Sequence, residues 1–231
     1  MRCCSKRCCG QGCWLVNIGG AVVRVPKWLS KINEFFSLRI LGLITWDLPR
    51  KIFTGKTYNL TFKDYLQFKS ITVYSPYILL TRKHSHLTTY FISIANALLG
   101  QKLSYWSHAA IVHGEDVYEA LGDGVQVNSL MYAMKSDAAV LLRPKGISEM
   151  EWFNVITEAR DNVGKPYDTD FDLANDNRLS CIEFVWDALL EVVGHKEKWP
   201  KFMNMVIEHG NVTPQMLYDS GDFEIVLEVR K

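Results

Sequence analysis

One short segment, residues 107–121 with the sequence SHAAIVHGEDVYEAL, constrains the fold more than any other part of the chain. It places two apolar runs on either side of Gly114 and Glu115, which we expect to form the two-residue turn of a β-hairpin, with glycine at the first central position. In that register Val112 faces Val117. A slip of one residue would turn every side chain of the strand to the opposite face.

The predicted register brings a histidine and a glutamate together. Because side chains alternate along a strand, His108, Ala110 and Val112 share one face, and His113 falls on the other. Glu119 is opposite Ala110 and projects from the same face as His108. Diagonal neighbours of this kind are typically about 7 to 8 Å apart, within reach of a carboxylate and an imidazole. The sequence therefore predicts a contact between His108 and Glu119.

The His108–Glu119 pair could take part in nucleophilic catalysis only if a nucleophile lies nearby. A carboxylate fixes the tautomer of an imidazole and stabilises the imidazolium that forms when a proton is taken, which is half of a nucleophilic constellation. A strand histidine that follows an aromatic pair such as Tyr105 and Trp106 is otherwise more often a structural or surface residue.

The segment NRLSCIEFVWDALLEVVG supplies a nucleophile. Ser180 followed by Glu183 has the form of a capping box, so Cys181 lies in the first turn of a predicted helix. Unpaired backbone N–H groups and the helix dipole there favour a thiolate and can stabilise an oxyanion. A buried cysteine that acts as a small apolar residue is the common alternative. Here the apolar stripe is supplied by other residues, which are Ile182, Val185, Trp186, Leu189 and Val193.

The remaining pattern from about residue 70 favours an α+β fold. We expect an extended segment over residues 71–82, a helix over 86–100 and a closing strand over 223–229, with further strands and helices between them.

Charge divides the chain into two parts. Residues 1–70 hold twelve Lys or Arg and three acidic residues, a net charge of +9, and the remainder carries −8 to give the total of +1. We expect a basic N-terminal extension over residues 1–70 and a catalytic domain over 71–231. A hydrophobic content of 48% with 22% charged residues is that of a folded protein.

Five of the six cysteines lie in the first 13 residues. No Cys-x-x-Cys pair occurs there and no histidine occurs before His84, so a zinc site is the weaker interpretation. Reversible S-acylation of a membrane-facing tail and a tail without a specific role remain alternatives. Cys181 is alone in the second part, which cannot form an internal disulfide and suits a reducing compartment.

The N-terminal part raises the question of a membrane. The uncharged run 8–23 is too short and too polar for a transmembrane helix, and it makes a poor signal peptide. Residues 26–46 have the spacing of an amphipathic helix, which would either pack on the main domain or lie on a membrane surface. We therefore expect a location inside the cell or at a membrane surface. No nucleic-acid-binding motif is present, and no nucleic-acid partner is expected.

Four motifs resemble the YiiX-like group of the NlpC-type papain-like superfamily, the circularly permuted branch in which the histidine strand precedes the cysteine helix. YILLTR is similar to the opening strand, and SHAAIV with VYEALGDGV is similar to the strands of the histidine and the acidic residue. GKPYDTDFD with LSCIEFVWDAL is similar to the tyrosine turn and the cysteine helix, and VTPQMLYDSGDFEIV is similar to the C-terminal end. The resemblance covers about residues 71–231. Departures are Pro76 and Tyr77 in place of Gly-Asp, and Ile182 after the cysteine.

The resemblance implies a permuted papain-like fold in which an antiparallel sheet packs against helices. It implies Cys181 as the nucleophile, His108 as the base and Glu119 as the residue that orients the histidine. Tyr167 would line the substrate site or assist the oxyanion, with packing on the sheet as an equal alternative. No cofactor or metal is expected. The run Asp168, Asp170, Asp172 and Asp176 lacks the glycine and glutamate of a calcium loop and is expected to be a solvated loop.

Three functions follow, in order of preference. The first is a thiol hydrolase that cleaves an amide or peptide bond through a thioester. The second is a lipid acyl hydrolase, thioesterase or acyltransferase that uses the same residues at a membrane surface, which residues 1–70 would contact. The third is a catalytically silent binding module. The expected substrates are accordingly a peptide, cell-wall material or a lipid acyl group.

Overall fold

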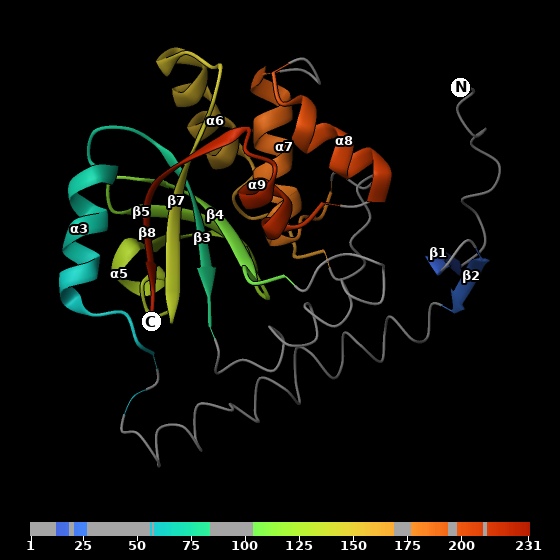
Figure 1. Ribbon diagram of the computed structural model, residues 1–231, viewed down its shortest axis with the longest axis horizontal. Coiled ribbons are helices and arrows are strands. Elements are labelled where there is room, and N and C mark those ends of the chain that lie inside the picture. Colours follow the sequence, from blue (N-terminus) through green and yellow to red (C-terminus); the bar gives the residue numbers. More distant parts are fainter. Residues whose placement is uncertain are drawn as a thin grey trace.

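The computed structural model describes residues 13–18, 21–26, 56, 58–83, 104–168, 177–193, 198–209 and 212–231. At its centre is a six-stranded antiparallel sheet with the strand order β6-β5-β4-β3-β7-β8 (Figure 1). The strands are β3 (Tyr77–Arg82), β4 (His108–His113), β5 (Asp116–Leu121), β6 (Gly124–Ser129), β7 (Ala138–Pro144) and β8 (Phe223–Arg230). The closing strand predicted over residues 223–229 is confirmed as β8.

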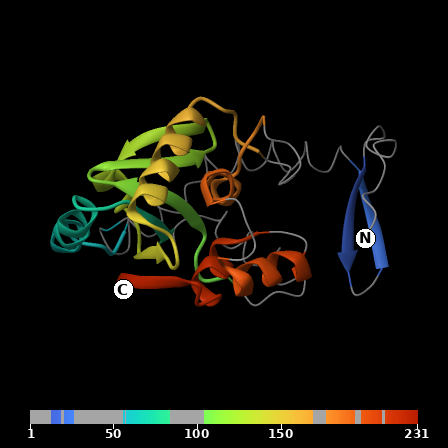
Figure 2. The same ribbon diagram turned by 90° about the horizontal axis from the view of Figure 1, so that it is seen from above.

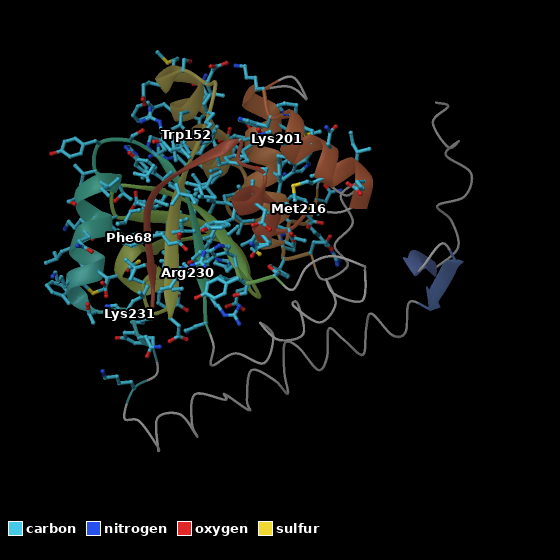
Figure 3. The ribbon with its side chains drawn as sticks, viewed as in Figure 1. Phe68, Trp152, Lys201, Met216, Arg230 and Lys231 are labelled. Atoms are coloured by element: carbon cyan, nitrogen blue, oxygen red, sulfur yellow. The ribbon has the colours of Figure 1, made fainter. Side chains whose placement is uncertain are left out.

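Helices cover both faces of this sheet (Figures 1 and 2). One face is covered by α6 (Glu149–Asp161), α7 (Cys181–Val193), α8 (Pro200–His209) and α9 (Pro214–Asp219). The other is covered by α3 (Phe62–Thr72) and α5 (Leu130–Ala133). Figure 3 labels Phe68 of α3 and Trp152 of α6, which are buried in the two separate cores. The architecture confirms the predicted α+β class.

Successive side chains of the central strands point to opposite faces of the sheet, so helices are needed on both faces to bury the apolar ones. In β3, Ile78 and Leu80 belong to the core under α6 and α7, whereas Tyr77 and Leu79 belong to the core under α3. A strand that is buried on both faces reads as a continuous apolar run, which is the pattern of YILL.

The helix α3 corrects the expected start of the sheet. Residues 71 and 72 were predicted to be extended, but they form the last turn of α3, and the strand begins at Tyr77. The helix starts at a capping box in which Thr61 and Asp64 bond to each other's backbone N–H groups. Because Tyr65 and Phe68 are buried against the sheet, α3 is held to the sheet across the predicted domain boundary at residue 70. The division at residue 70 itself stays a prediction.

The N-terminal part contributes an antiparallel pair of strands, β1 (Cys13–Ile18) and β2 (Ala21–Pro26). The helices predicted over residues 26–46 and 86–100 lie outside the described residues, apart from Pro26 at the end of β2. Among the helices that the structure describes, none combines the length and the apolar character needed to cross a bilayer.

Candidate active site

Cys181 is the first residue of α7, as the capping box predicts. The backbone N–H of Ser180 donates to the Glu183 carboxylate at 2.8 Å, and the backbone N–H of Glu183 donates to the Ser180 hydroxyl at 3.4 Å. These bonds fix the first turn of the helix and leave the sulfur beside the positive end of the helix dipole. Cys181 is 6% exposed and packs at the edge of the core that α7 shares with the sheet.

His108 and Glu119 lie at the same end of the β4–β5 hairpin, away from its turn. The turn falls at Gly114 and Glu115, as predicted, and Gly114 adopts a left-handed φ of 64°. Val112 pairs with Val117 in the expected register. The predicted contact is confirmed, because Nε2 of His108 is 2.6 Å from Oε2 of Glu119.

The imidazole of His108 also contacts the sulfur of Cys181. Burial by itself would lower the pKa of the imidazole, but hydrogen bonds with Cys181 and Glu119 and their negative charges raise the pKa of His108 to about 10. Since Nε2 faces the carboxylate, Nδ1 is the nitrogen left for the sulfur. Sulfur, imidazole and carboxylate therefore form a continuous chain, and the His108 side chain remains 21% exposed to solvent.

The Glu119 carboxylate is almost fully buried, with only 2% of the residue exposed. Burial opposes its ionisation, but the hydrogen bonds from His108 and Asn128 outweigh this effect and lower the pKa of Glu119. The Asn128 amide donates to Oε1 at 2.8 Å, and His108 occupies Oε2. Asn128 was not identified from the sequence, although it lies two residues beyond Gln126, the partner of Glu119 in the β5–β6 register, and on the same face.

Tyr167 lies beside the cysteine. Burial raises the pKa of its phenol well above the ordinary value, and the charges of Cys181 and Glu183 act in the same direction. A hydrogen bond with the backbone of Cys181 opposes this rise, which identifies the Cys181 N–H as a donor to the phenol oxygen. The phenol therefore meets a backbone N–H group at the start of α7, and donors of this kind can stabilise an oxyanion.

A backbone clamp holds the segment that carries Tyr167. The N–H of Val125 donates to Lys165 O at 2.8 Å, and the N–H of Gly164 donates to Val125 O at 2.9 Å. On the other side, the N–H of Leu179 donates to Pro166 O at 3.0 Å. Gly124 makes the close approach feasible, because a Cβ atom there would lie 2.5 Å from Lys165 O. The strand β6 and the start of α7 are thus tied to the residues on both sides of Tyr167.

Residues 76–227 match the family described as permuted papain-like amidase enzyme, YaeF/YiiX, C92 family. The chain belongs to this family. It is a cysteine hydrolase of the permuted papain-like amidase type, and the YiiX-like resemblance of its motifs is confirmed.

Among solved structures, this permuted papain-like amidase is similar to the crystal structure of the metalloprotein YiiX from Escherichia coli O157:H7. The two chains are 19% identical and superpose with a TM-score of 0.49 over 68% of this chain and 98% of that one. No curated protein matches the chain significantly.

The acidic run of the amidase departs from the sequence-based expectation at Asp168. This residue is 1% exposed, so the prediction of a solvated loop is wrong there, because the clamp that places Tyr167 also draws the next residue inside. Asp170, Asp172 and Asp176 lie outside the described residues. Within the described ranges, no cluster of three or more His, Cys, Asp or Glu side chains has the arrangement of a metal site.

Proposed function

We propose that this amidase cleaves an amide or peptide bond through a thioester on Cys181, with His108 as the acid and base and Glu119 as the group that orients the imidazole. The observation that supports this assignment is the position of the His108 ring, which contacts the Cys181 sulfur and the Glu119 carboxylate at once. A cationic imidazole beside a sulfur stabilises the thiolate, which is the reactive form of cysteine.

In the first half of the proposed reaction, the thiolate of Cys181 attacks the carbonyl carbon of the substrate and forms a tetrahedral oxyanion. The C–N bond then breaks as Nδ1–H of His108 protonates the leaving nitrogen. The products are a free amine, a thioester on Cys181 and a neutral imidazole. The Glu119 carboxylate holds Nε2–H throughout, so that Nδ1 stays directed at the sulfur and the leaving group.

In the second half, water attacks the thioester carbonyl and gives its proton to the neutral His108. The second tetrahedral oxyanion collapses, the C–S bond breaks, and the carboxylic acid leaves. Thiolate and imidazolium are thereby restored. An amine or alcohol in place of water would turn the same steps into an acyl transfer.

We assign Tyr167 to the substrate-binding side of the site. Its phenol oxygen accepts the Cys181 backbone N–H in the free enzyme. When a substrate carbonyl oxygen takes that N–H, the phenol O–H can rotate and donate to the same oxygen. The oxyanion would then receive two hydrogen-bond donors, which stabilise the charge that develops in the transition state.

A second candidate is a lipid acyl hydrolase, thioesterase or acyltransferase that acts at a membrane surface with the same three residues. The net charge of +9 over residues 1–70 favours it, because the anionic lipids of a bilayer attract basic segments. This candidate differs from the first in the acyl donor and not in the cysteine chemistry.

Thiol-specific labelling tests the proposed nucleophile. The full chain is treated with an activity-based thiol probe at neutral pH, and the labelled cysteine is mapped by peptide mass spectrometry. We expect Cys181 to react faster than the N-terminal cysteines and to lose this advantage in His108→Ala. Equal and slow labelling of Cys181 in the wild type and in His108→Ala would favour a silent binding module.

A further inference from the structure

The helix α3 exposes apolar side chains on the side that faces away from the sheet. Phe62 is 64% exposed and Leu66 is 48% exposed, and the two are one helical turn apart. Beyond the exposed Ser70, the turn after the helix adds Val73 at 53% and Tyr74 at 82%. Isolated apolar side chains on a surface need no explanation, but a group of large ones on one side of a helix and in the turn after it is a candidate interaction site.

The short helix α5 extends this surface. It lies next to α3 over the same face of the sheet (Figure 1). Met131 is 48% exposed and Tyr132 is 50% exposed. We use the name α3–α5 face for the exposed set of Phe62, Leu66, Val73, Tyr74, Met131 and Tyr132.

The α3–α5 face is held firmly from beneath. Tyr65 and Phe68 on the inner side of α3 are buried in the core. The end of α3 is tied to the β4–β5 turn, since Gly114 N–H donates to Thr72 O at 2.8 Å and the Thr72 hydroxyl donates to Gly114 O at 2.7 Å. The α3–α5 face is therefore a fixed surface that exists before any partner binds.

Basic side chains are interleaved with this apolar surface. The charged residues of α3 that reach the surface are Lys63 and Lys69, whereas Asp64 is buried and paired with Lys231. Lys69 is also paired with the partly exposed Glu115. Two residues beyond α5, the exposed Lys135 places its ammonium 5.5 Å from the centre of the Tyr132 ring of that helix.

The combination of apolar and lysine side chains on the α3–α5 face favours a membrane over a protein as the partner. The core of a protein interface is depleted in lysine, and its charged groups lie at the rim. At a bilayer surface, aromatic and aliphatic side chains enter the headgroup region while lysine ammonium groups reach the lipid phosphates. The segment 1–70 ends within α3 and carries a net charge of +9. It therefore adds long-range attraction to an anionic surface.

We propose that the α3–α5 face docks this protein on an anionic membrane surface. The proposal goes beyond the hydrolytic chemistry, because it concerns a surface on which none of the proposed catalytic residues lies. Phe62 and Leu66 enter the interface, and Lys63 and Lys135 contact the phosphates.

Vesicle flotation with the full chain tests the proposal. Wild type should float with vesicles of phosphatidylcholine and phosphatidylserine, float less with phosphatidylcholine alone, and lose binding as salt rises. The double variant Phe62→Ser/Leu66→Ser should bind the anionic vesicles at least about tenfold more weakly, given the apolar area it removes. The matched control is Met150→Ser/Ile207→Ser, two apolar residues on α6 and α8 that are 72% and 62% exposed, and it should bind like wild type.

Failure of wild type to float with the anionic vesicles overturns the proposal. Vesicle binding that is equally weakened in the two double variants overturns it as well. Loss of self-association in Phe62→Ser/Leu66→Ser, measured by light scattering and without an effect on flotation, would assign the face to a second copy of the chain instead. Cys181→Ala separates the two proposals, because it should abolish hydrolysis and retain vesicle binding. Circular dichroism confirms that each variant is folded.

Discussion

Nε2 of His108 lies 2.6 Å from Oε2 of Glu119, and this contact joins the first residue of β4 to a residue near the end of β5. The carboxylate is buried, and its other oxygen is occupied by Asn128. The ring is thereby fixed from behind, so its remaining nitrogen is available to the sulfur of Cys181. The proposed mechanism depends on this fixed orientation.

Replacement of Glu119 by glutamine should disturb the orientation and the charge of the His108 ring. The amide keeps the size of the side chain but cannot stabilise the imidazolium, and it can force the wrong tautomer on the ring. We expect Glu119→Gln to lower kcat of amide hydrolysis by about 10²- to 10⁴-fold. The control is Glu115→Gln, an exposed residue at the turn of the same hairpin, which should retain wild-type activity. Equal loss in the two variants would contradict the role of Glu119.

The charge state of His108 gives a direct prediction on pH. Its pKa of about 10 lies above the ordinary value of 6.5, so the folded protein should keep an imidazolium through neutral pH and lose it only as the pH approaches about 10. Nitrogen-15 NMR of the labelled histidines measures this titration. In Cys181→Ala the pKa should fall, because the hydrogen bond and the charge of the sulfur are gone. An ordinary titration near pH 6.5 in the wild type would exclude the proposed ion pair.

Tyr167 should matter for the rate and not for the fold. Tyr167→Phe removes the hydroxyl and keeps the ring, so we expect kcat to fall about tenfold to hundredfold while KM changes little. Tyr65→Phe is the control, since its hydroxyl bonds to Glu115 on the opposite side of the sheet. If Tyr167→Phe has wild-type kcat, the ring serves packing alone.

Asn128 should act through Glu119 as a positioning residue. Loss of a hydrogen bond to a buried charge costs about 1.5 to 3 kcal/mol, so Asn128→Ala should lower kcat about tenfold to hundredfold. Asn128→Asp would place a second carboxylate beside Glu119 and raise the pKa of Glu119, which should shift the acidic limb of the pH–rate profile upward. The neighbouring exposed Val127 provides the control in Val127→Ala. If both Asn128 variants change the stability of the protein but leave the pH–rate profile unchanged, Asn128 has a structural role alone.

Gly124 should be intolerant of a side chain. Its φ of 108° and the 2.5 Å approach of a Cβ to Lys165 O mean that Gly124→Ala must displace the backbone that carries Tyr167. We expect a loss of stability of about 2 to 4 kcal/mol together with a loss of activity. Gly114→Ala is the matched control, because its φ of 64° is left-handed but no atom lies within 4 Å. It should cost about 1 to 2 kcal/mol. Similar urea midpoints for the two variants would show that the clamp is not rigid.

Local rules predicted the elements that carry the three proposed residues. A glycine turn with alternating strands placed His108 beside Glu119, and a capping box placed Cys181 at the start of a helix, because each depends on neighbours in the chain. The position of Tyr167 came from the resemblance and not from local spacing.

Contacts between distant segments could not be predicted in this way. Asn128 meets Glu119 only through the register of the next hairpin, and the clamp between Val125 and Lys165 joins backbones forty residues apart. The charge pattern placed a boundary at residue 70, but it carries no information on packing. The burial of Phe68 on the inner side of α3 was therefore missed.

The most direct test of the account is a search for the acyl-enzyme itself. The full chain is mixed with a native extract, quenched in acid, digested and analysed by mass spectrometry for adducts on the peptide that contains Cys181. We predict an acyl group on that sulfur, bound as a hydroxylamine-sensitive thioester, whose mass separates a peptide or cell-wall fragment from a fatty acyl chain. The adduct should accumulate in His108→Ala less than in the wild type. The contradicting result has two parts. Cys181 stays unmodified while the enzyme turns over substrate, and Cys181→Ala retains that turnover.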